Sequence, residues 1–272
     1  MINDKYEYLY DNKEEPDEAF LRLFNIIKIL RIECPWDKIQ THETLIPCMK
    51  EETYEAIDAI YNKNIENLRE ELGDVLLQVV FHGIIAEETS EFELSDVINE
   101  ECEKMIRRHP HVFSEKEDKS IDKVLETWEN IKCSEHSIIN KTDKLRSVPK
   151  TFPALIRSYK IQKKAAEVGF DWEDINGAID KIDEETIELK EAIIENDYKH
   201  ISEELGDLLF AVVNVARFAK VNPEESLVNT SEKFINRFNY IEEEALNMGE
   251  TMEKLSLEEM ETLWNKAKEK GL

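Results

Sequence analysis

Residues 70–81 read EELGDVLLQVVF, and residues 203–216 read EELGDLLFAVVNVA. The second part of each stretch is as apolar as a buried helix, whereas the first part places acidic side chains around a glycine. An apolar run of this length, with almost no turn residues, predicts a central helix. Because the pattern occurs only twice, it favours a duplicated helical domain over a solenoid of many repeats.

A second acidic motif precedes each copy at the same distance. Residues 51–55 read EETYE and residues 184–188 read EETIE, and each lies 19 residues ahead of its partner motif. Side chains three residues apart share a helix face, and a short turn makes two helices antiparallel neighbours. The spacing therefore predicts that four carboxylates converge in each half: Glu52, Glu55, Glu71 and Asp74 in the first, and Glu185, Glu188, Glu204 and Asp207 in the second.

Carboxylates gathered beside a core repel one another unless a cation lies between them. Oxygen ligands select hard divalent ions, above all Mg²⁺, which keeps several waters and shares its remaining positions with substrate phosphates. Mn²⁺ is expected to substitute. In a chain with 61 acidic residues, such spacing also occurs on solvated faces. The repetition with the same flanking residues and the same spacing favours a metal site.

Gly73 and Gly206 occupy the same position in the two motifs. A glycine inside a helix costs about 1 kcal/mol relative to alanine, so its repeated use needs a reason. The prediction is that another helix or a ligand approaches closely at this point.

The composition limits the class of protein. A formal net charge of −26 disfavours binding to nucleic acid polymers and to anionic membranes. No apolar run approaches the roughly 18 residues of a membrane-spanning helix, and the first residues do not resemble a signal peptide. The four cysteines form no CxxC pair, which indicates reduced thiols and a cytoplasmic location.

Few glycines and prolines, and long charged and apolar runs, predict an all-α fold of two tandem helical bundles. The expected organisation is an acidic tail at 1–18, a first domain at 19–135, a polar linker at 136–155 and a second domain at 156–272. Helical bundles of this size usually dimerise through an apolar face, so a homodimer is expected. The helices are expected at 19–32, 41–60 after a break near Pro47, 65–88, 94–108, 124–132, 154–168, 178–195, 198–220, 223–247 and 257–270.

The motifs together resemble the MazG family of nucleoside triphosphate pyrophosphohydrolases. The resemblance rests on the duplicated EETxE and EELGD motifs, on CPWD upstream, on RRHPHVF after the first copy and on VGFDW before the second. It covers nearly the whole chain. It implies an all-α fold related to the dimeric helical dUTPases, homodimers, Mg²⁺ dependence, and cleavage of a nucleoside triphosphate to the monophosphate and pyrophosphate.

The resemblance also implies roles for individual residues. The metal ligands fall on the two acidic quartets named above, and the catalytic group comprises Glu184 with the quartet of the second half. Substrate contacts fall on Lys181, Glu184, Glu203, Lys233, Arg237 and Trp264, with Lys104, Arg108 and Trp128 as parallel candidates in the first half. Lys233 and Arg237 are one helical turn apart, so both can reach one triphosphate, and Trp264 can stack on a base.

The two copies differ where Lys181 precedes Glu185 by four residues, because the aligned residue before Glu52 is Cys48, which carries no positive charge. The second half is therefore expected to be the main nucleotide site. Whether the first half is active or is a degenerate structural partner stays open.

The expected mechanism is attack of water on the α-phosphorus with pyrophosphate as the leaving group. Glu184 or a member of the quartet would accept the proton of that water, and the sequence does not choose between them. The implied role is removal of aberrant or excess nucleotides. Two alternatives stay open: a pyrimidine-specific dUTP or dCTP pyrophosphatase on the same scaffold, and a non-enzymatic acidic helical module that binds metal or a basic partner.

Overall fold

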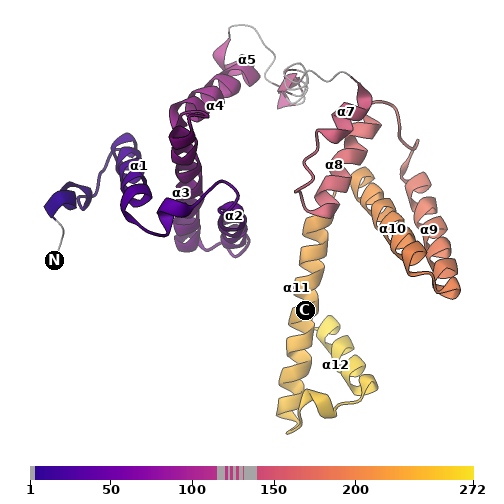
Figure 1. Ribbon diagram of the computed structural model, residues 1–272. Coiled ribbons are helices and arrows are strands. Elements are labelled where there is room, and N and C mark those ends of the chain that lie inside the picture. The colour runs from indigo at the N-terminus through magenta and orange to yellow at the C-terminus, as the bar shows by residue number, and fades with distance from the viewer. Residues whose placement is uncertain (1–3, 115–119, 122, 125–126, 129–130, 132–139) are drawn as a thin grey trace. The chain divides into compact units, whose positions relative to one another are not determined.

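The computed structural model describes residues 4–114, 120–121, 123–124, 127–128, 131 and 140–272. Within these ranges every regular element is a helix and no strand occurs, which confirms the all-α prediction. The chain forms two compact units, Met1–His136 and Ser137–Leu272. Figure 1 shows the helices of both units.

The first unit is built around one long helix. Its elements are η1 (Asp4–Leu9), α1 (Pro16–Glu33), η2 (Asp37–Ile39), α2 (Ile46–Tyr61), α3 (Ile65–Thr89), α4 (Leu94–Arg108) and α5 (Pro110–Phe113). The core of this unit consists largely of α3 residues, joined by Ile27 from α1, by Leu45 and by Leu94 from α4. The prediction that the apolar run after Asp74 forms a central helix is therefore confirmed.

The helices α2 and α3 form the antiparallel hairpin that the motif spacing predicts. Pro47 lies in the first turn of α2, where its missing N–H is not needed. The turn between the helices places Lys63 at φ 53°, and the side chain of Asn64 then caps α3 by accepting from the N–H of Asn67 at 3.1 Å. These local signals bring the two acidic motifs onto neighbouring helices.

Side-chain contacts tie the segment before α1 to α1 itself. Arg22 donates from its Nε to the carbonyl oxygen of Leu9 at 2.6 Å, and Lys5 pairs with Glu33 at 2.6 Å. The poorly anchored tail expected at 1–18 thus includes a short 3₁₀ helix tied to α1 by these contacts.

The second unit repeats the hairpin and extends it. Its elements are α7 (Lys141–Arg146), α8 (Ala154–Ala166), α9 (Ile175–Glu195), α10 (Tyr198–Phe218), α11 (Pro223–Asn247), η3 (Met252–Lys254) and α12 (Leu257–Glu269). Figure 1 shows α9 and α10 side by side, joined by a short turn. Helix α8 packs on α10, whereas α11 contacts α8 and α12. Side-chain caps begin the long helices, from Asp174, Asp197, Asn222 and Ser256.

The segment expected as a linker contains a helix that the sequence analysis missed. Helix α7 lies within it, begins at the cap residue Asn140, and is tied to the end of α8 by an ion pair between Lys144 and Glu167 at 2.5 Å. Val148, which follows α7, is buried. Residues 136–139 of the expected linker, and most of the short helix expected at 124–132, lie outside the described residues.

No described helix is both long enough and apolar enough to cross a membrane.

Candidate metal and nucleotide site

In the second unit, the α9–α10 hairpin brings three carboxylates together. Oxygen atoms of Glu185, Glu188 and Glu204 all lie within 4.8 Å of one another, and we call this group the second acidic cluster. Glu185 and Glu188 are three residues apart on α9, and Glu204 faces them from α10. Glu185 is 4% exposed, and the other two are half-buried. A cluster this sheltered holds negative charge where water screens it poorly.

One lysine partly neutralises the second acidic cluster. The Nζ of Lys181 lies 2.6 Å from Glu185 and 2.8 Å from Glu184, which brings together three of the residues named from the sequence. Hydrogen bonds to Glu184 and then to Glu185 raise the pKa of Lys181, so its positive charge is strongly favoured. Lys181 is only half-buried, and its ammonium can also bind phosphate oxygens.

Glu188 is the member of the second acidic cluster whose pKa reflects the charges of its two acidic neighbours. Burial raises the pKa of the Glu188 carboxyl, the charges of Glu185 and Glu204 raise it further, and Lys181 opposes them. His200 also contacts the cluster, with its Nε2 3.1 Å from Glu204 and its Nδ1 3.3 Å from Glu195. Sequence reasoning missed His200, although its position one helical turn before Glu204 was a usable signal.

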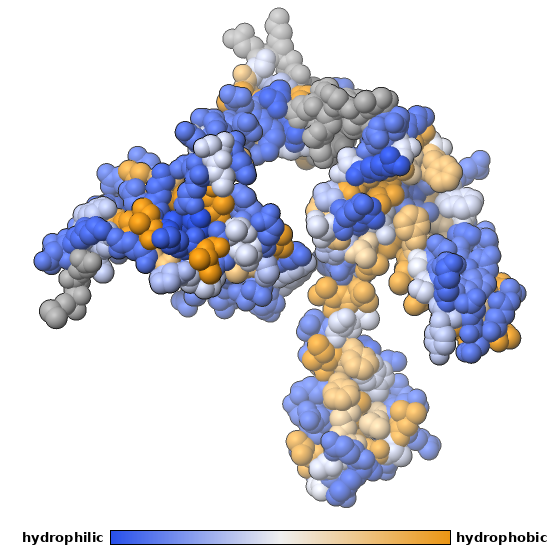
Figure 2. Space-filling model, in the orientation of Figure 1, coloured by the Kyte–Doolittle hydropathy of each residue, from blue (hydrophilic) through white to orange (hydrophobic). Residues whose placement is uncertain are grey.

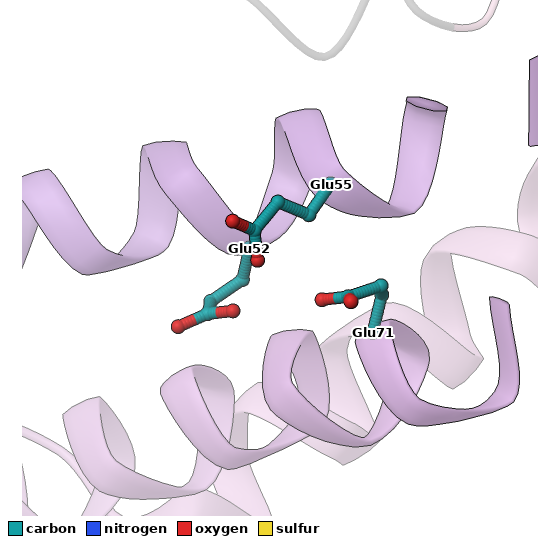
Figure 3. Close-up of side chains that lie close together, drawn as sticks. All are labelled: Glu52, Glu55 and Glu71. Atoms are coloured by element: carbon teal, nitrogen blue, oxygen red, sulfur yellow. The ribbon is translucent and has the colours of Figure 1, made fainter. Parts of the chain in front are cut away.

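The first unit contains the equivalent group on the α2–α3 hairpin. Oxygen atoms of Glu52, Glu55 and Glu71 lie within 4.8 Å of one another, and Figure 3 shows these side chains directed into the space between two helices. We call this group the first acidic cluster. Burial raises the pKa of Glu52 and of Glu71, and neighbouring acidic charges add to both shifts.

The position that holds Lys181 in the second unit holds Cys48 in the first. Cys48 packs against the hydrophobic core of the first unit and brings no positive charge to the first acidic cluster. The difference between the copies seen in the sequence therefore has an electrostatic counterpart. Lys181 opposes the rise in the pKa of Glu188 in the second cluster, whereas only burial and acidic neighbours act on Glu52 and Glu71 in the first.

The predicted fourth carboxylate of each set lies outside the group of three. Asp74 is near enough for its charge to raise the pKa values of Glu52 and Glu71, but it is not among the mutually close carboxylates. Asp207 is exposed and likewise lies outside the second acidic cluster. An aspartate side chain is one methylene shorter than a glutamate side chain, so it reaches less far from the helix at the same i, i+3 spacing.

The sequence predicts that another helix or a ligand approaches closely at Gly73 and Gly206, and within the described residues no other helix does so. The approach of a ligand stays a prediction. A Cβ added at either residue would have no atom within 4 Å besides its own helix and adjacent residues. Both glycines face open space, so no described helix needs them to be small.

The basic and aromatic residues assigned to substrate contact form a separate arrangement. The Arg237 guanidinium on α11 lies 5.4 Å from the ring centre of Trp264 on α12, and the Phe234 ring lies 5.1 Å from the same tryptophan. Lys233 is exposed. Among the described residues, no hydrogen bond or ion pair joins Lys233, Arg237 or Trp264 to the second acidic cluster.

The first unit repeats the arginine–tryptophan pair. The Arg108 guanidinium also lies 5.4 Å from a tryptophan ring, that of Trp128, and Lys104 forms an ion pair with Glu101. Glu203, the remaining predicted contact, is exposed and lies 3.6 Å from Lys199. Both halves therefore carry the same two kinds of chemistry, an acidic cluster on a hairpin and an arginine on an indole face.

The two acidic clusters fit a hard divalent cation by the chemistry of their donors. They offer only carboxylate oxygens, the ligand type of Mg²⁺ and Mn²⁺, and half-buried positions that leave room for water and substrate. Burial and then neighbouring acidic charges raise the pKa values of Glu52, Glu71 and Glu188, and a cation bound between the carboxylates would offset both effects. The structure thus defines an all-α protein of two tandem units, each with an acidic cluster suited to a divalent ion on one helical hairpin.

Comparisons with known proteins agree with this class. The model of the MazG nucleotide pyrophosphohydrolase domain matches the chain twice, over residues 40–113 and 175–242, and each range contains one acidic cluster. A Thermotoga maritima protein named nucleoside triphosphate pyrophosphohydrolase/pyrophosphatase MazG is 45% identical over 257 residues, which cover 94% of this chain and 98% of that protein.

Two further relatives are similar over most of this chain. An Escherichia coli K12 protein named nucleoside triphosphate pyrophosphohydrolase is 41% identical over 254 residues, 91% of this chain and 96% of that protein. The uncharacterised Bacillus subtilis protein YabN is 49% identical over 237 residues, 87% of this chain and 48% of that protein. The chain belongs to the MazG nucleotide pyrophosphohydrolase family, which confirms the resemblance seen in its motifs.

Proposed function

We propose that this protein hydrolyses ribonucleoside and deoxyribonucleoside triphosphates to the monophosphate and pyrophosphate with the help of Mg²⁺. The observation that carries the proposal is the recurrence of one acidic cluster at the same place in both copies of the MazG hairpin. Two close relatives carry the name nucleoside triphosphate pyrophosphohydrolase, which supports the same reaction class, a hydrolase acting on phosphorus anhydrides.

Glu185, Glu188 and Glu204 would hold the cation in the second half, and Asp207 would join them if its exposed side chain turned inward. Glu52, Glu55 and Glu71, with Asp74 nearby, are the corresponding ligands in the first half. A bound Mg²⁺ supplies neutralisation of the triphosphate charge and activation of water. Mn²⁺ is expected to act in its place.

The chain's own residues supply the remaining chemistry at the α-phosphorus. Lys181 reaches the edge of the second acidic cluster and can bind triphosphate oxygens there as a point charge. Glu184 lies beside Lys181, is largely exposed and is not a member of the second acidic cluster, so it can take a proton from the attacking water without serving as a metal ligand. The leaving pyrophosphate carries charge that an arginine fork such as that of Arg237 can bind.

A homodimer would complete this site. On α10, Leu205, Leu209 and Val212 are 46%, 50% and 45% exposed and follow one another at helical spacing along one face. The equivalent residues of α3, which are Leu72, Leu76 and Val79, are exposed in the same way. Figure 2 also shows apolar residues exposed along α11. These stripes support burial against a second copy, which could bring Lys233, Arg237 and Trp264 to the cluster.

The proposed activity fits a cytoplasmic protein that acts on free nucleotides. The free thiols of Cys34, Cys48 and Cys102 support a reducing, cytoplasmic environment. The role would be removal of aberrant or excess nucleotides. The negative charge and the absence of any membrane-spanning helix among the described residues support small nucleotides as ligands, in preference to nucleic acid or lipid.

The experiment is product analysis with a nucleotide panel in ¹⁸O-labelled water. We expect pyrophosphate and a monophosphate that carries the label from purine and pyrimidine triphosphates alike. Label in inorganic phosphate would contradict attack at the α-phosphorus, and turnover of dUTP or dCTP alone would favour the pyrimidine-specific alternative. The absence of turnover with every nucleotide would favour the non-enzymatic alternative.

Matched variants assign the activity to one half. Glu204→Gln should lower kcat by about a hundredfold or more, since it removes a charged group at the reacting centre. Glu71→Gln makes the same change in the first acidic cluster. Glu191→Gln alters an exposed carboxylate on α9 outside the cluster and serves as the control. Full activity in a folded Glu204→Gln variant would remove the second acidic cluster from the mechanism.

A further inference from the structure

Two histidines of the first unit form a contact that no role assigned so far uses. The Nδ1 atom of His42, in the segment between η2 and α2, lies 2.7 Å from the Nδ1 atom of His82 on α3. We propose that this pair, here called the histidine latch, holds the start of α2 against α3 at neutral pH and releases it when both rings are protonated. The proposal concerns the first unit alone and does not depend on the reaction that the protein catalyses.

The two rings of the histidine latch meet edge to edge. Their planes are 5° apart and their centres are 5.0 Å apart. This separation equals the distance between the two nitrogens plus about one ring radius on each side, so both nitrogens lie near the line that joins the ring centres. Face-to-face stacking would keep the ring atoms about 3.5 Å apart or more, and the shorter distance between the nitrogens excludes it. The arrangement is that of a straight N–H···N hydrogen bond.

A hydrogen bond between two ring nitrogens needs one proton and tolerates only one. A neutral imidazole has one N–H and one bare nitrogen, so one ring donates from its Nδ1 and the other accepts at its Nδ1. One added proton leaves this bond in place, because it can bind the bare Nε2 of the donating ring. A second added proton makes both Nδ1 atoms donors, and two like charges then face each other at hydrogen-bond distance. The contact must then open.

The surroundings of the histidine latch favour the first added proton and oppose the second. The Nε2 of His42 lies 3.7 Å from a carboxylate oxygen of Glu91, which follows the end of α3, and the acidic Glu43 adjoins His42 in the sequence. These charges stabilise a protonated His42. Burial lowers the pKa of His82, and the charge of His42 lowers it further. The second proton should therefore bind only below the ordinary pKa of histidine.

Other charges near the histidine latch do not titrate in the range of histidine. The first turn of α2 carries no acidic residue, and the adjoining η2 carries one acid and one base, Asp37 and Lys38. Charged residues on the helices packed against this part of α3 have partners of their own: the ion pairs Lys28–Glu87 and Arg31–Glu88, and the capping pair Glu93 and Asp96. Carboxylates, lysine and arginine keep their charge between about pH 5 and pH 8, so the change in charge here comes from the two rings.

The histidine latch closes the open end of the first hairpin. A short turn at residues 62–64 joins α2 to α3, so the start of α2 lies at the far end, beside the later part of α3. Leu45, three residues after His42, is 2% exposed and belongs to the core with Val80 and Ile84, which lie two residues before and after His82. Release of the two rings would therefore let the segment before α2 leave this core.

The second unit has apolar residues at the same two positions. Its acidic cluster lies 133 residues after that of the first unit, so His42 and His82 correspond to Ile175 and Val215. Both are half-buried, as the two histidines are. An apolar pair binds no proton, so mild acid should open the first unit at this point and leave the second unit closed.

Hydrogen exchange of the full-length protein, followed by mass spectrometry, tests the histidine latch. Between about pH 8 and pH 5, after correction for intrinsic exchange rates, the amides of residues 41–48 should lose protection about tenfold or more, and those of residues 174–181 should not. The double variant His42→Ile/His82→Val, which carries the residues of the second unit, should lose less than about twofold at residues 41–48. His111→Asn removes a histidine outside the pair and should behave like the wild type.

Two outcomes of the exchange experiment would overturn the proposal: an equal loss of protection in the wild type and the double variant, or no loss in either. If the double variant does not fold, ¹⁵N NMR of the histidine rings in the wild-type protein decides. The histidine latch predicts two separate protonation steps for His42 and His82, the second below the ordinary pKa of histidine, with residues 41–48 losing protection at that second step. Two rings that titrate independently at the ordinary pKa would overturn it.

Discussion

The two acidic clusters should release different numbers of protons when they bind a divalent ion. A metal ligand must be deprotonated, so each carboxyl that carries a proton in the metal-free protein loses it on binding. Burial is the main cause that raises the pKa values of Glu52 and Glu71 in the first acidic cluster, and it also raises that of Glu188 in the second. We therefore expect the first half to release more protons per ion than the second, in which Lys181 opposes the rise in the pKa of Glu188.

The direction in which metal affinity changes with pH follows from the raised pKa values. Raised pKa values leave more of these carboxyl groups protonated as the pH falls from neutrality, so metal affinity falls. Below the raised pKa values, each proton that a ligand must lose weakens metal binding by up to about tenfold per pH unit, so the affinity of the first half should fall more steeply. Without metal, the same groups favour the fold at acidic pH, and this stabilisation is lost as the pH rises through their folded pKa values.

Calorimetric titration with Mg²⁺ or Mn²⁺, in two buffers of different ionisation enthalpy, measures the proton count. Glu204→Gln leaves the first acidic cluster intact, and Glu71→Gln leaves the second. Adding Lys181→Met to the Glu71→Gln variant should raise the count of the second half, because Lys181 lowers the pKa of Glu188 and pairs with Glu185. Equal counts in the two halves, or no response to the lysine substitution, would refute the electrostatic account.

Three further predictions concern other parts of the proposal. Arg237→Met and Trp264→Leu should each raise KM for ATP about tenfold with a smaller change in kcat, measured by pyrophosphate release; unchanged KM would place this pair outside the site. Leu209→Asp puts a charge in the exposed apolar stripe of α10 and should shift a dimer to monomer in light scattering, whereas an unaltered mass would exclude this face. Gly206→Ala should stabilise the protein by up to about 1 kcal/mol in thermal unfolding, because nothing in this chain meets the added Cβ, and loss of activity would reveal a ligand or second copy there.

Helix boundaries were predictable from the sequence where a strong local signal marked them. The starts of α4, α10 and α11 agree with the expected ranges, and Pro223 lies in the first turn of α11. Helix α9 begins three residues earlier than expected, because Asp174 caps it and Gly177 lies inside it beneath Trp172. A glycine required by tertiary packing looks the same in sequence as a glycine that ends a helix.

Helix α7 was not predictable from local pattern alone. It has only six residues and no apolar periodicity, and its place is supported by the contact of Lys144 with Glu167. The sequence holds no sign of this pairing, since the two residues belong to different elements. Short helices of this kind depend on tertiary contacts more than on their own propensity.

The candidate site was predictable to the extent that helical spacing determines it. Spacing brought Glu185, Glu188 and Glu204 together correctly, since i, i+3 neighbours and an antiparallel hairpin leave little freedom. It did not foresee that Asp207 would remain exposed, which depends on side-chain length and helix phase. The cavity between α8, α10 and the segment that joins α8 to α9 was not predicted, because the residues that line it come from four separate segments of the chain.

The most direct test of the metal sites is anomalous diffraction from crystals grown with Mn²⁺. The account predicts one or more anomalous peaks within coordination distance, about 2.2 Å, of carboxylate oxygens of Glu185, Glu188 and Glu204, and an equivalent peak among Glu52, Glu55 and Glu71. Peaks confined to other surface carboxylates, with both clusters empty at saturating Mn²⁺, would contradict it.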